Sequence, residues 1–284
     1  MSKFYVGQTI LSKNDNKRCI VEYTYDQKEG EDREYRVTFD VDKKMKILRE
    51  SDLALIPNTY SSSEVRHFSF GDTEKEYIRK YKIYYLFHFT HRNNLGEILS
   101  TGLLPKNRLV KDRYTSIADE EVQVIRAGVN FYLYGKINKP IHDCVPLYIS
   151  WRTPTLYKVL HKGTIEPRDI IYILVNTYSI LRKNYCFTDG NAASIHTKQY
   201  VLLNNLDKLD WSVIKSDEWG GDNERIRKKN AEFLVFPKID VRDIYKLIVF
   251  DNDIKQEVQN AIRSRNLSLE VDVDTRYYEW PKMF

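Results

Sequence analysis

The sequence predicts an α+β protein in which a small β-barrel precedes a larger domain of strands and helices. Residues 3–56 contain four or five short strand-like runs separated by turns, which is typical of an SH3-like or Tudor-like barrel. Beyond residue 75, apolar runs of strand length alternate with amphipathic stretches of helical period. The 284 residues suffice for one substantial core and a small additional domain.

The barrel is expected over residues 1–60. A charged loop at 26–32 joins its two middle strands as a hairpin, and the polar, small-residue stretch 58–63 marks the linker that follows. Residues 1–75 carry 13 Lys and Arg against 14 Asp and Glu, so this balanced region fits a targeting module and a packing accessory equally well. The strands are expected at 4–11, 18–25, 34–39 and 45–48.

The second domain is expected over residues 75–284. A helix at 72–81, which Asp72 can cap, leads into an aromatic-rich strand at 83–91. A helix then starts at 93–94 and ends at Gly102. Later strands are expected at 145–150, 169–175, 200–202, 231–236, 246–250 and 268–273, and later helices at 116–126, 155–161 and 251–264.

Charge and hydropathy narrow the function classes. The net charge is +5, and the whole excess lies in residues 76–284, where 32 basic side chains stand against 26 acidic ones. This modest excess is compatible with a polyanionic partner, and some of the 21 tyrosines can stack on bases. No apolar run is long enough to span a bilayer and the N-terminus has no signal-peptide pattern, so we expect a cytoplasmic protein.

Cysteine and histidine spacing favours neither disulfides nor metal. Cys19, Cys144 and Cys186 are widely spaced without a CxxC pattern, so reduced structural thiols are expected. The six histidines form no HExxH or HxxxH pattern. We therefore expect no metal.

A lone carboxylate, Glu232, interrupts the apolar run 231–236, just after the basic segment 225–229. An unpartnered carboxylate costs several kcal/mol to desolvate, so a glutamate at the mouth of a core strand indicates a functional site. The alternative is a structural ion pair with Arg227 or Lys229 on an exposed strand face.

Two further regions are candidates for a functional site. His88 and Thr90 reach the end of strand 83–91 directly before a helix, a suitable place for a ligand, although a hydrogen-bonded core histidine is the alternative. Residues 105–140 are basic and lack clean periodicity. A segment this long is often functional in a compact domain, but a solvated basic surface fits equally well.

Four segments, in this order, resemble one family. They are FHFTH at 87–91 with Asn94, VPLY at 145–148 with RxPxLY at 152–157, FTDGNAA at 187–193, and AEFLV at 231–235. Residues 80–250 are thereby similar to DarT, the DNA ADP-ribosyltransferase toxins of bacterial toxin–antitoxin systems. The resemblance implies an ADP-ribosyltransferase fold with two packed β-sheets, surrounding helices and NAD in the cleft between the sheets.

The resemblance also implies the chemistry: ADP-ribose passes from NAD to a base of single-stranded DNA, and nicotinamide leaves. Glu232 is the implied catalytic residue, because its carboxylate can stabilise the oxocarbenium-like ribose and accept a proton from the attacking base. His88, Thr90 and Asn94 match NAD-holding positions. We choose Arg126 as the catalytic arginine that grips the NAD phosphates, with Arg113 in reserve.

The implied DNA groove involves further side chains. Stacking and phosphate contacts are expected from Tyr148, Arg152 and His196, and from Arg225 and Arg227 in a loop before the catalytic strand. A macrodomain antitoxin is the implied protein partner. Trp151, Thr155 and the insertion at 105–140 depart from the better-known members, so guanine and thymine both stay open as target.

Two other function classes stay open. One is an ADP-ribosyltransferase that acts on RNA or protein, which would show no dependence on added single-stranded DNA. The other is a nucleic-acid-binding module with a decayed transferase fold. The joint presence of Glu232, His88 and Thr90 argues against decay.

Overall fold

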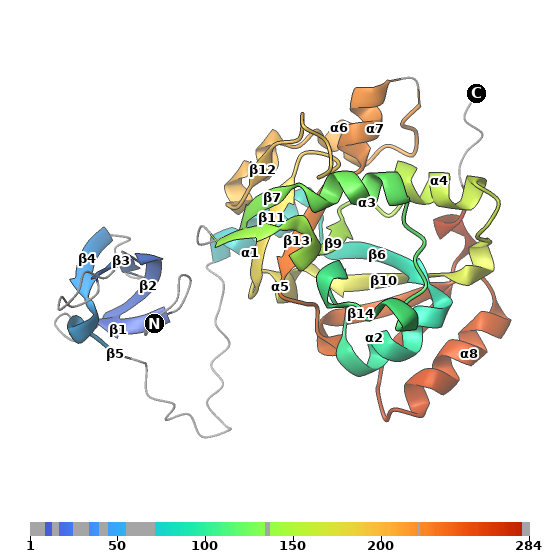
Figure 1. Cartoon of the computed structure of the whole chain (residues 1–284), viewed down its shortest axis with the longest axis horizontal. Helices are drawn as coiled ribbons and strands as arrows, with labels where there is room; N and C mark the ends of the chain where they lie inside the picture. The colour runs from blue at the N-terminus through green and yellow to red at the C-terminus, as the bar shows by residue number, and fades with distance from the viewer. Residues whose placement is uncertain are drawn as a thin grey trace. The chain divides into compact units, whose positions relative to one another are not determined.

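A computed structural model describes residues 9–12, 17–24, 34–39, 45–54, 72–133, 137–220 and 222–279 (Figure 1). The chain divides into two compact units. The first comprises 1–69 with 132–138, and the second comprises 70–131 with 139–284.

The first unit holds a five-stranded antiparallel sheet in the order β4-β3-β2-β1-β5. The predicted second, third and fourth strands are confirmed. Of the predicted strand 4–11, only the last residues are described, and the loop 26–32 and the linker 58–63 lie outside the described residues. The strands are β1 (Thr9–Ser12), β2 (Lys17–Thr24), β3 (Glu34–Phe39), β4 (Met45–Arg49) and β5 (Leu53–Ala54).

The second unit is built on an eight-stranded sheet in the order β12-β11-β13-β9-β6-β10-β14-β15. All its neighbouring strands are antiparallel except β14 and β15, which are parallel. The strands are β6 (Tyr85–His91), β9 (Val145–Tyr148), β10 (Ile170–Asn176), β11 (Asn184–Thr188), β12 (Gln199–Tyr200), β13 (Glu232–Phe236), β14 (Ile244–Val249) and β15 (Glu270–Val273). A separate ladder joins β7 (Asn130–Leu133) to β8 (Ile137–Pro140).

The expectation of two packed sheets is wrong for the described residues, because hydrogen bonding joins these strands into one sheet. The join between its halves is narrow, since β6 and β9 share the single pair Phe87–Tyr148. By contrast, β6 and β10 pair along seven residues. The sheet is therefore continuous but weakly tied between β6 and β9.

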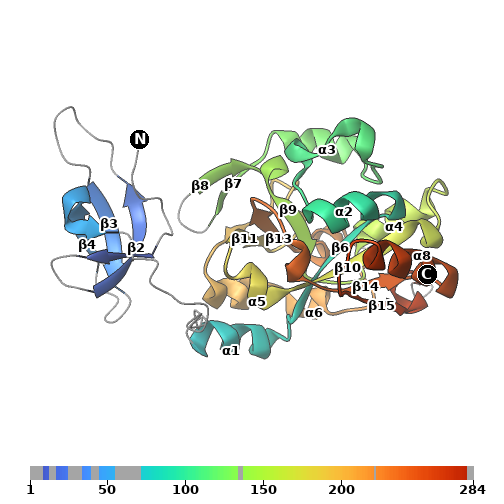
Figure 2. The ribbon, with the colours of Figure 1, turned by 90° about the horizontal axis from the view of Figure 1, so that it is seen from below.

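Helices cover both faces of this sheet. Figure 1 shows α2 and α8 on one side of the central strands and α4 on the other, and Figure 2 gives the view from below. Residues of α1, α2, α6 and α8 belong to the larger apolar core, while α4 packs with Ile170, Tyr172 and Tyr278 on the opposite face. The helices are α1 (Asp72–Tyr81), α2 (Leu95–Thr101), α3 (Glu120–Ala127), α4 (Pro154–His161), α5 (Thr177–Ile180), α6 (Trp211–Ile214), α7 (Asn223–Lys229) and α8 (Asn252–Arg263).

Local signals explain most of these boundaries. In α8, Ile254, Val258 and Ile262 recur at helical spacing and are buried, and the Asp251 carboxylate caps the helix by accepting from the Ile254 N–H. Gly102 ends α2 with a positive φ of 83°, a conformation that suits glycine. The predicted helices at 72–81, 155–161 and 251–264 are confirmed within one residue at each end.

Candidate active site

Glu232 opens β13 and is 1% exposed. Its carboxylate makes a bidentate pair with Arg126, in which Nη1 donates to Oε1 and Nη2 donates to Oε2, each at 3.1 Å. The Ala192 N–H donates to the same Oε1 at 2.8 Å. The buried charge is therefore paired and hydrogen-bonded, which offsets the desolvation cost that the sequence indicated. The alternative pairing with Arg227 or Lys229 is excluded, because both of those side chains bond elsewhere.

Arg126 comes from the last turn of α3, in the insertion at 105–140. Asp119 caps this helix by accepting from the N–H groups of Glu121 and Val122, and its other oxygen accepts from Lys158 of α4 and from Lys162, which directly follows α4. Burial disfavours the Arg126 charge, but the Glu232 carboxylate outweighs it, so the pKa of Arg126 is raised. The guanidinium stays charged, and the contact is a true ion pair.

A row of three side chains crosses the sheet at Glu232. Tyr148 of β9 lies opposite Glu232, and Phe87 of β6 lies opposite Tyr148. Paired residues of neighbouring strands project from the same sheet face, so the three side chains share one face. Burial and the nearby Glu232 charge raise the pKa of Tyr148 to about 12, so its phenol is neutral at physiological pH. The ring stacks on Phe89, with centroids 5.4 Å apart.

His88 lies on β6 next to this row. Its Nδ1 is 3.0 Å from the Pro146 carbonyl oxygen. Burial lowers the pKa of the imidazole, although the Pro146 bond opposes the shift. Because a carbonyl only accepts, Nδ1 carries the proton and Nε2 of the neutral ring is an acceptor. His88 therefore offers a hydrogen-bond acceptor on β6, which β9 separates from β13, and on the sheet face opposite to Phe87.

Thr90 and Asn94 form a second buried polar group. The Asn94 amide donates to Thr90 Oγ1 and to the Thr115 carbonyl, both at 2.9 Å, and its oxygen accepts from the Thr115 N–H. The amide is thus used within the protein to fasten the insertion to β6. These bonds give Asn94 a positioning task, and the direct NAD contact that the resemblance implies for Asn94 stays a prediction.

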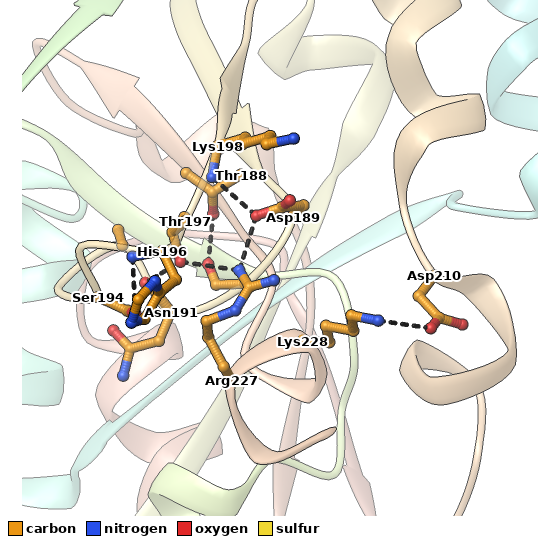
Figure 3. A network of polar contacts seen from close by, with 12 residues as sticks. Thr188, Asp189, Asn191, Ser194, His196, Thr197, Lys198, Asp210, Arg227 and Lys228 are labelled. Atoms are coloured by element: carbon orange, nitrogen blue, oxygen red, sulfur yellow. Dashed lines mark hydrogen bonds and ion pairs between the residues drawn. The ribbon is translucent and has the colours of Figure 1, made fainter. Parts of the chain in front are cut away.

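The turn 189–198 is held by Arg227 of α7 (Figure 3). The guanidinium donates to Asp189 at 2.7 Å, to Thr197 at 3.0 Å and to both oxygens of Glu224. Gly190 packs directly on it: a Cβ at this position would lie 2.9 Å from the Arg227 carbonyl oxygen. The turn that donates the Ala192 N–H to Glu232 is therefore fixed by Arg227.

The expected DNA-binding residues differ in their location and in their contacts. Tyr148 lies in the row with Glu232, and His196 is exposed in the turn 189–198. Arg152 pairs with Asp217 at 2.8 Å and lies over the Trp151 ring. The expectation that Arg225 and Arg227 lie in a loop is wrong, because both belong to α7, which Asp222 caps. Arg113 is exposed, and the Glu232 carboxylate bonds Arg126 and Ala192 and not Arg113.

Sequence reasoning missed three features of the site. Ala192 contributes a backbone donor, for which no side-chain pattern exists. Arg227 acts on the turn rather than facing outward, and its only signal in the sequence is Gly190 in the turn. Lys229 is buried and donates to the Ile214 and Ser216 carbonyls.

Two structural findings bear on cofactor and environment. Within the described ranges, no three His, Cys, Asp or Glu side chains lie together in a way that could hold a metal ion. In the same part of the chain, no helix is both long and apolar enough to cross a membrane.

The sheet, the buried glutamate at the start of β13 and its neighbours on β9 and β6 define an ADP-ribosyltransferase domain. The family model for the single-stranded DNA thymidine ADP-ribosyltransferase DarT matches residues 87–280. The chain belongs to the DarT family.

Named relatives agree with this assignment. A DNA ADP-ribosyl transferase of Thermus aquaticus is 31% identical over 62% of this chain and 80% of its own length. A fusion of such a transferase with a DNA ADP-ribosyl glycohydrolase, from Thermosipho africanus, is 27% identical over 66% of this chain and 48% of its own. Thermus sp. 2.9 DarT in complex with ADP-ribosylated ssDNA superposes with a TM-score of 0.65 and 25% identity, covering 70% of this chain and 97% of that one. The same protein in complex with NAD+ gives a TM-score of 0.62 at 23% identity.

Proposed function

We propose that this protein transfers ADP-ribose from NAD to a base of single-stranded DNA and releases nicotinamide. The observation that carries the proposal is the buried Glu232–Arg126 pair at the start of β13, facing Tyr148, in a chain of the DarT family. A charge held in this way is preorganised to stabilise positive charge that develops on a sugar carbon.

The bond changes balance without an added reagent. The bond from ribose C1′ to the nicotinamide nitrogen breaks, and its electron pair leaves with nicotinamide, which becomes neutral. A nitrogen of the base forms the new bond to C1′, and the proton of that nitrogen passes to Glu232. Oε1 of Glu232 accepts two hydrogen bonds and Oε2 accepts one among the described residues. Oε2 thus keeps a lone pair for the proton.

The other residues receive distinct roles. Arg126 orients Glu232, and its remaining N–H groups are available to the NAD phosphates. His88 and Thr90 hold NAD, with Nε2 of His88 accepting from a hydroxyl group. Tyr148, Arg152 and His196 are assigned to the DNA strand, while Arg225 and Arg227 act through α7 and the turn it fixes.

Several further assignments belong to this proposal. The five-stranded first unit is an SH3-like or Tudor-like barrel over residues 1–60, followed by the transferase domain at 75–284. The protein is a cytoplasmic toxin, and a macrodomain that removes the mark is its antitoxin. The Thermosipho africanus fusion, which joins transferase and glycohydrolase in one chain, supports such a pairing.

The test is incubation with NAD and single-stranded oligonucleotides, read by intact mass. One oligonucleotide contains adenine, cytosine and thymine. A second contains adenine, cytosine and guanine. Because the family description names thymidine, a gain of one ADP-ribose is expected on the thymine oligonucleotide. An RNA of matched sequence is expected to gain nothing.

Glu232→Gln is the matched variant, since the amide preserves side-chain size and one acceptor for Arg126. It should lower the transfer rate by at least about 10²-fold, the usual cost of losing one preorganised electrostatic group. A thermal melt confirms that the variant is folded. NAD consumption without any mass gain on DNA or RNA would overturn the proposal and point to a protein acceptor.

A further inference from the structure

A pocket of about 220 Å³ lies where β6 and β9 separate. These strands share only the Phe87–Tyr148 pair, so no ladder joins the chain before Phe87 to the chain after Tyr148. Residues 81–85 and 149–151 line the opening, and α6 with Lys229 closes it. Residues 81–86 precede the segment that the DarT family model matches, so part of the pocket is built from residues that the family description does not cover.

The pocket wall is basic. Lys82, Lys215 and Lys229 line it, and no Asp or Glu does. In the described part of the chain neither Lys82 nor Lys215 makes an ion pair, and both are exposed. Lys229 is 1% exposed and its ammonium donates to the carbonyls of Ile214 and Ser216, which leaves one of its three N–H groups for a ligand. Such a wall attracts an anion.

The same wall is aromatic. Tyr84 is 42% exposed, and Trp151 and Trp211 also line the pocket. Trp211 is held rigidly, because it stacks on Tyr81 at 4.6 Å and its indole N–H donates to the Leu206 carbonyl. Aromatic faces next to cationic side chains are the combination with which proteins hold single-stranded nucleic acid.

The pocket adjoins the catalytic glutamate. Its wall residue Phe87 ends the row that starts at Glu232, two strand spacings or about 10 Å away. Lys229 lies three residues before Glu232, and the N–H of Ile149 in the pocket wall donates to the Ala231 carbonyl. The pocket is thus within reach of a nucleotide that neighbours a target base at Glu232.

We propose that this pocket binds one nucleotide that flanks the target base, with its phosphate near the lysines and its base against Tyr84 or Trp151. The inference rests on the proposed DNA transfer. The volume is below the roughly 300–1,000 Å³ of pockets for drug-sized ligands, so it suits one nucleotide and not a whole NAD molecule.

The test pairs two charge-reversed variants of the full chain. Lys82→Glu with Lys215→Glu alters the pocket, and Lys255→Glu with Arg263→Glu makes the same charge change on α8, away from it. Binding of an oligo-dT and the single-turnover rate at saturating DNA are measured over a range of salt concentrations. The pocket variant should bind about tenfold more weakly. Its slope of log Kd against log salt should fall by about 0.7 for each phosphate that the variant no longer neutralises.

A second pair tests the stacking. Tyr84→Ala should weaken binding of oligo-dT about tenfold, as expected when one base–aromatic stack is removed, whereas Tyr84→Phe should bind as the native protein does. A trimmed oligonucleotide that ends at the target base on the side facing the pocket should bind all variants equally.

The outcomes separate the two proposals. If the native protein modifies no DNA, the proposed function fails. If it modifies DNA but both charge variants bind equally well, the pocket is not a nucleotide site. If the pocket variant instead raises KM for NAD and leaves DNA affinity unchanged, the pocket holds part of NAD and the inference is overturned.

Discussion

Arg227 affects the proposed reaction by positioning a turn, without contacting the Glu232 carboxylate itself. It bonds Asp189, Thr197 and Glu224, and thereby fixes the turn whose Ala192 N–H meets Glu232. Arg227→Ala leaves the largely buried Asp189 carboxylate without its cationic partner and with only the Lys198 N–H as donor, which we expect to cost about 1–3 kcal/mol of unfolding free energy. The single-turnover rate should fall more than the DNA affinity, because the turn orients Glu232.

Arg225→Ala is the matched control on the same helix. Its guanidinium donates to the Glu218 carbonyl at 3.3 Å and not to the turn 189–198, so urea unfolding and the single-turnover rate at saturating DNA should stay close to native. If Arg227→Ala weakens DNA binding and leaves the saturated rate intact, Arg227 is a DNA contact and the positioning role is wrong.

His88 gives a pH dependence with a defined sign. Burial lowers its pKa below the ordinary 6.5, so the folded protein holds the ring neutral while the unfolded chain protonates it first. The resulting stability is complete above about pH 6.5 and is lost as the pH falls through the lower folded pKa. His88→Gln should flatten the decline in Tm below pH 6.5.

The same variant keeps an N–H for the Pro146 carbonyl, so its Tm at pH 8 should remain close to native. His142, whose pKa burial also lowers, contributes to the slope in both proteins and cancels in the comparison. Melting curves from pH 5 to 8 check this, and an identical slope in the variant would show that His88 is not buried neutral.

Sequence alone reaches some of these residues and not others. Glu232 is identifiable because a charge inside an apolar strand is anomalous, and His88 because it lies near the end of such a strand. The partner Arg126 is 106 positions from Glu232, a distance at which no periodicity operates. The sequence offers it only as an arginine in the right region, and the resemblance implies a phosphate contact rather than an ion pair with Glu232.

At the scale of elements, the stability and position of α3 depend on contacts made at its two ends. It has eight residues, too few for stability in isolation, and Arg126 in its last turn is the residue that reaches Glu232. Asp119 caps its start and bonds Lys158 of α4 and Lys162, which directly follows α4. Asp119→Ala should therefore increase amide hydrogen exchange across 120–127 and lower kcat/KM severalfold.

Asp112→Ala is the control for this prediction, because Asp112 lies exposed in a short turn of the same insertion. Lys158 and Lys162 hold the pKa of the Asp119 carboxyl well below its usual range. The carboxylate stays charged until the pH falls below the ordinary aspartate range, so native exchange at 120–127 should be insensitive to the ionisation of Asp119 between pH 5 and 8. Increased exchange without any loss of activity would separate α3 from catalysis.

The helix α7 shows where element prediction fails. Residues 225–229 suggest a basic segment next to a strand, because four of the five are charged. The structure makes them helical, with Asp222 as cap, and turns Arg227 and Lys229 inward to Asp189 and the Ile214 carbonyl. Tertiary partners, which the local sequence does not contain, decide this segment.

At the scale of the molecule, the sheet is predictable strand by strand but not in its connectivity. Most strand positions follow from apolar runs and turns. Whether β6 and β9 belong to one sheet or two depends on the single pair Phe87–Tyr148, which no local pattern encodes. The pocket beside that pair is likewise invisible in the sequence.

The first unit is expected to contribute to DNA binding and not to catalysis. Its sheet is formed within residues 9–54, and the DarT family model begins only at residue 87, so catalysis should not require it. A second binding surface on the same chain raises the effective concentration of a bound strand at the active site. A variant lacking residues 1–60 should therefore show a higher KM for DNA, with an unchanged single-turnover rate at saturation.

Charge refines this expectation. Residues 1–75 have 13 basic and 14 acidic side chains, so their contribution to DNA affinity should come from stacking and hydrogen bonds rather than net charge. The salt dependence of KM should then be nearly the same with and without the first unit, because few counterions are released there. KM titrations at several salt concentrations measure both quantities, with circular dichroism to confirm folding of the shortened chain. An unchanged KM would leave the first unit no part in DNA binding, whereas a weaker salt dependence in the shortened chain would reveal a basic contact surface despite the balanced composition.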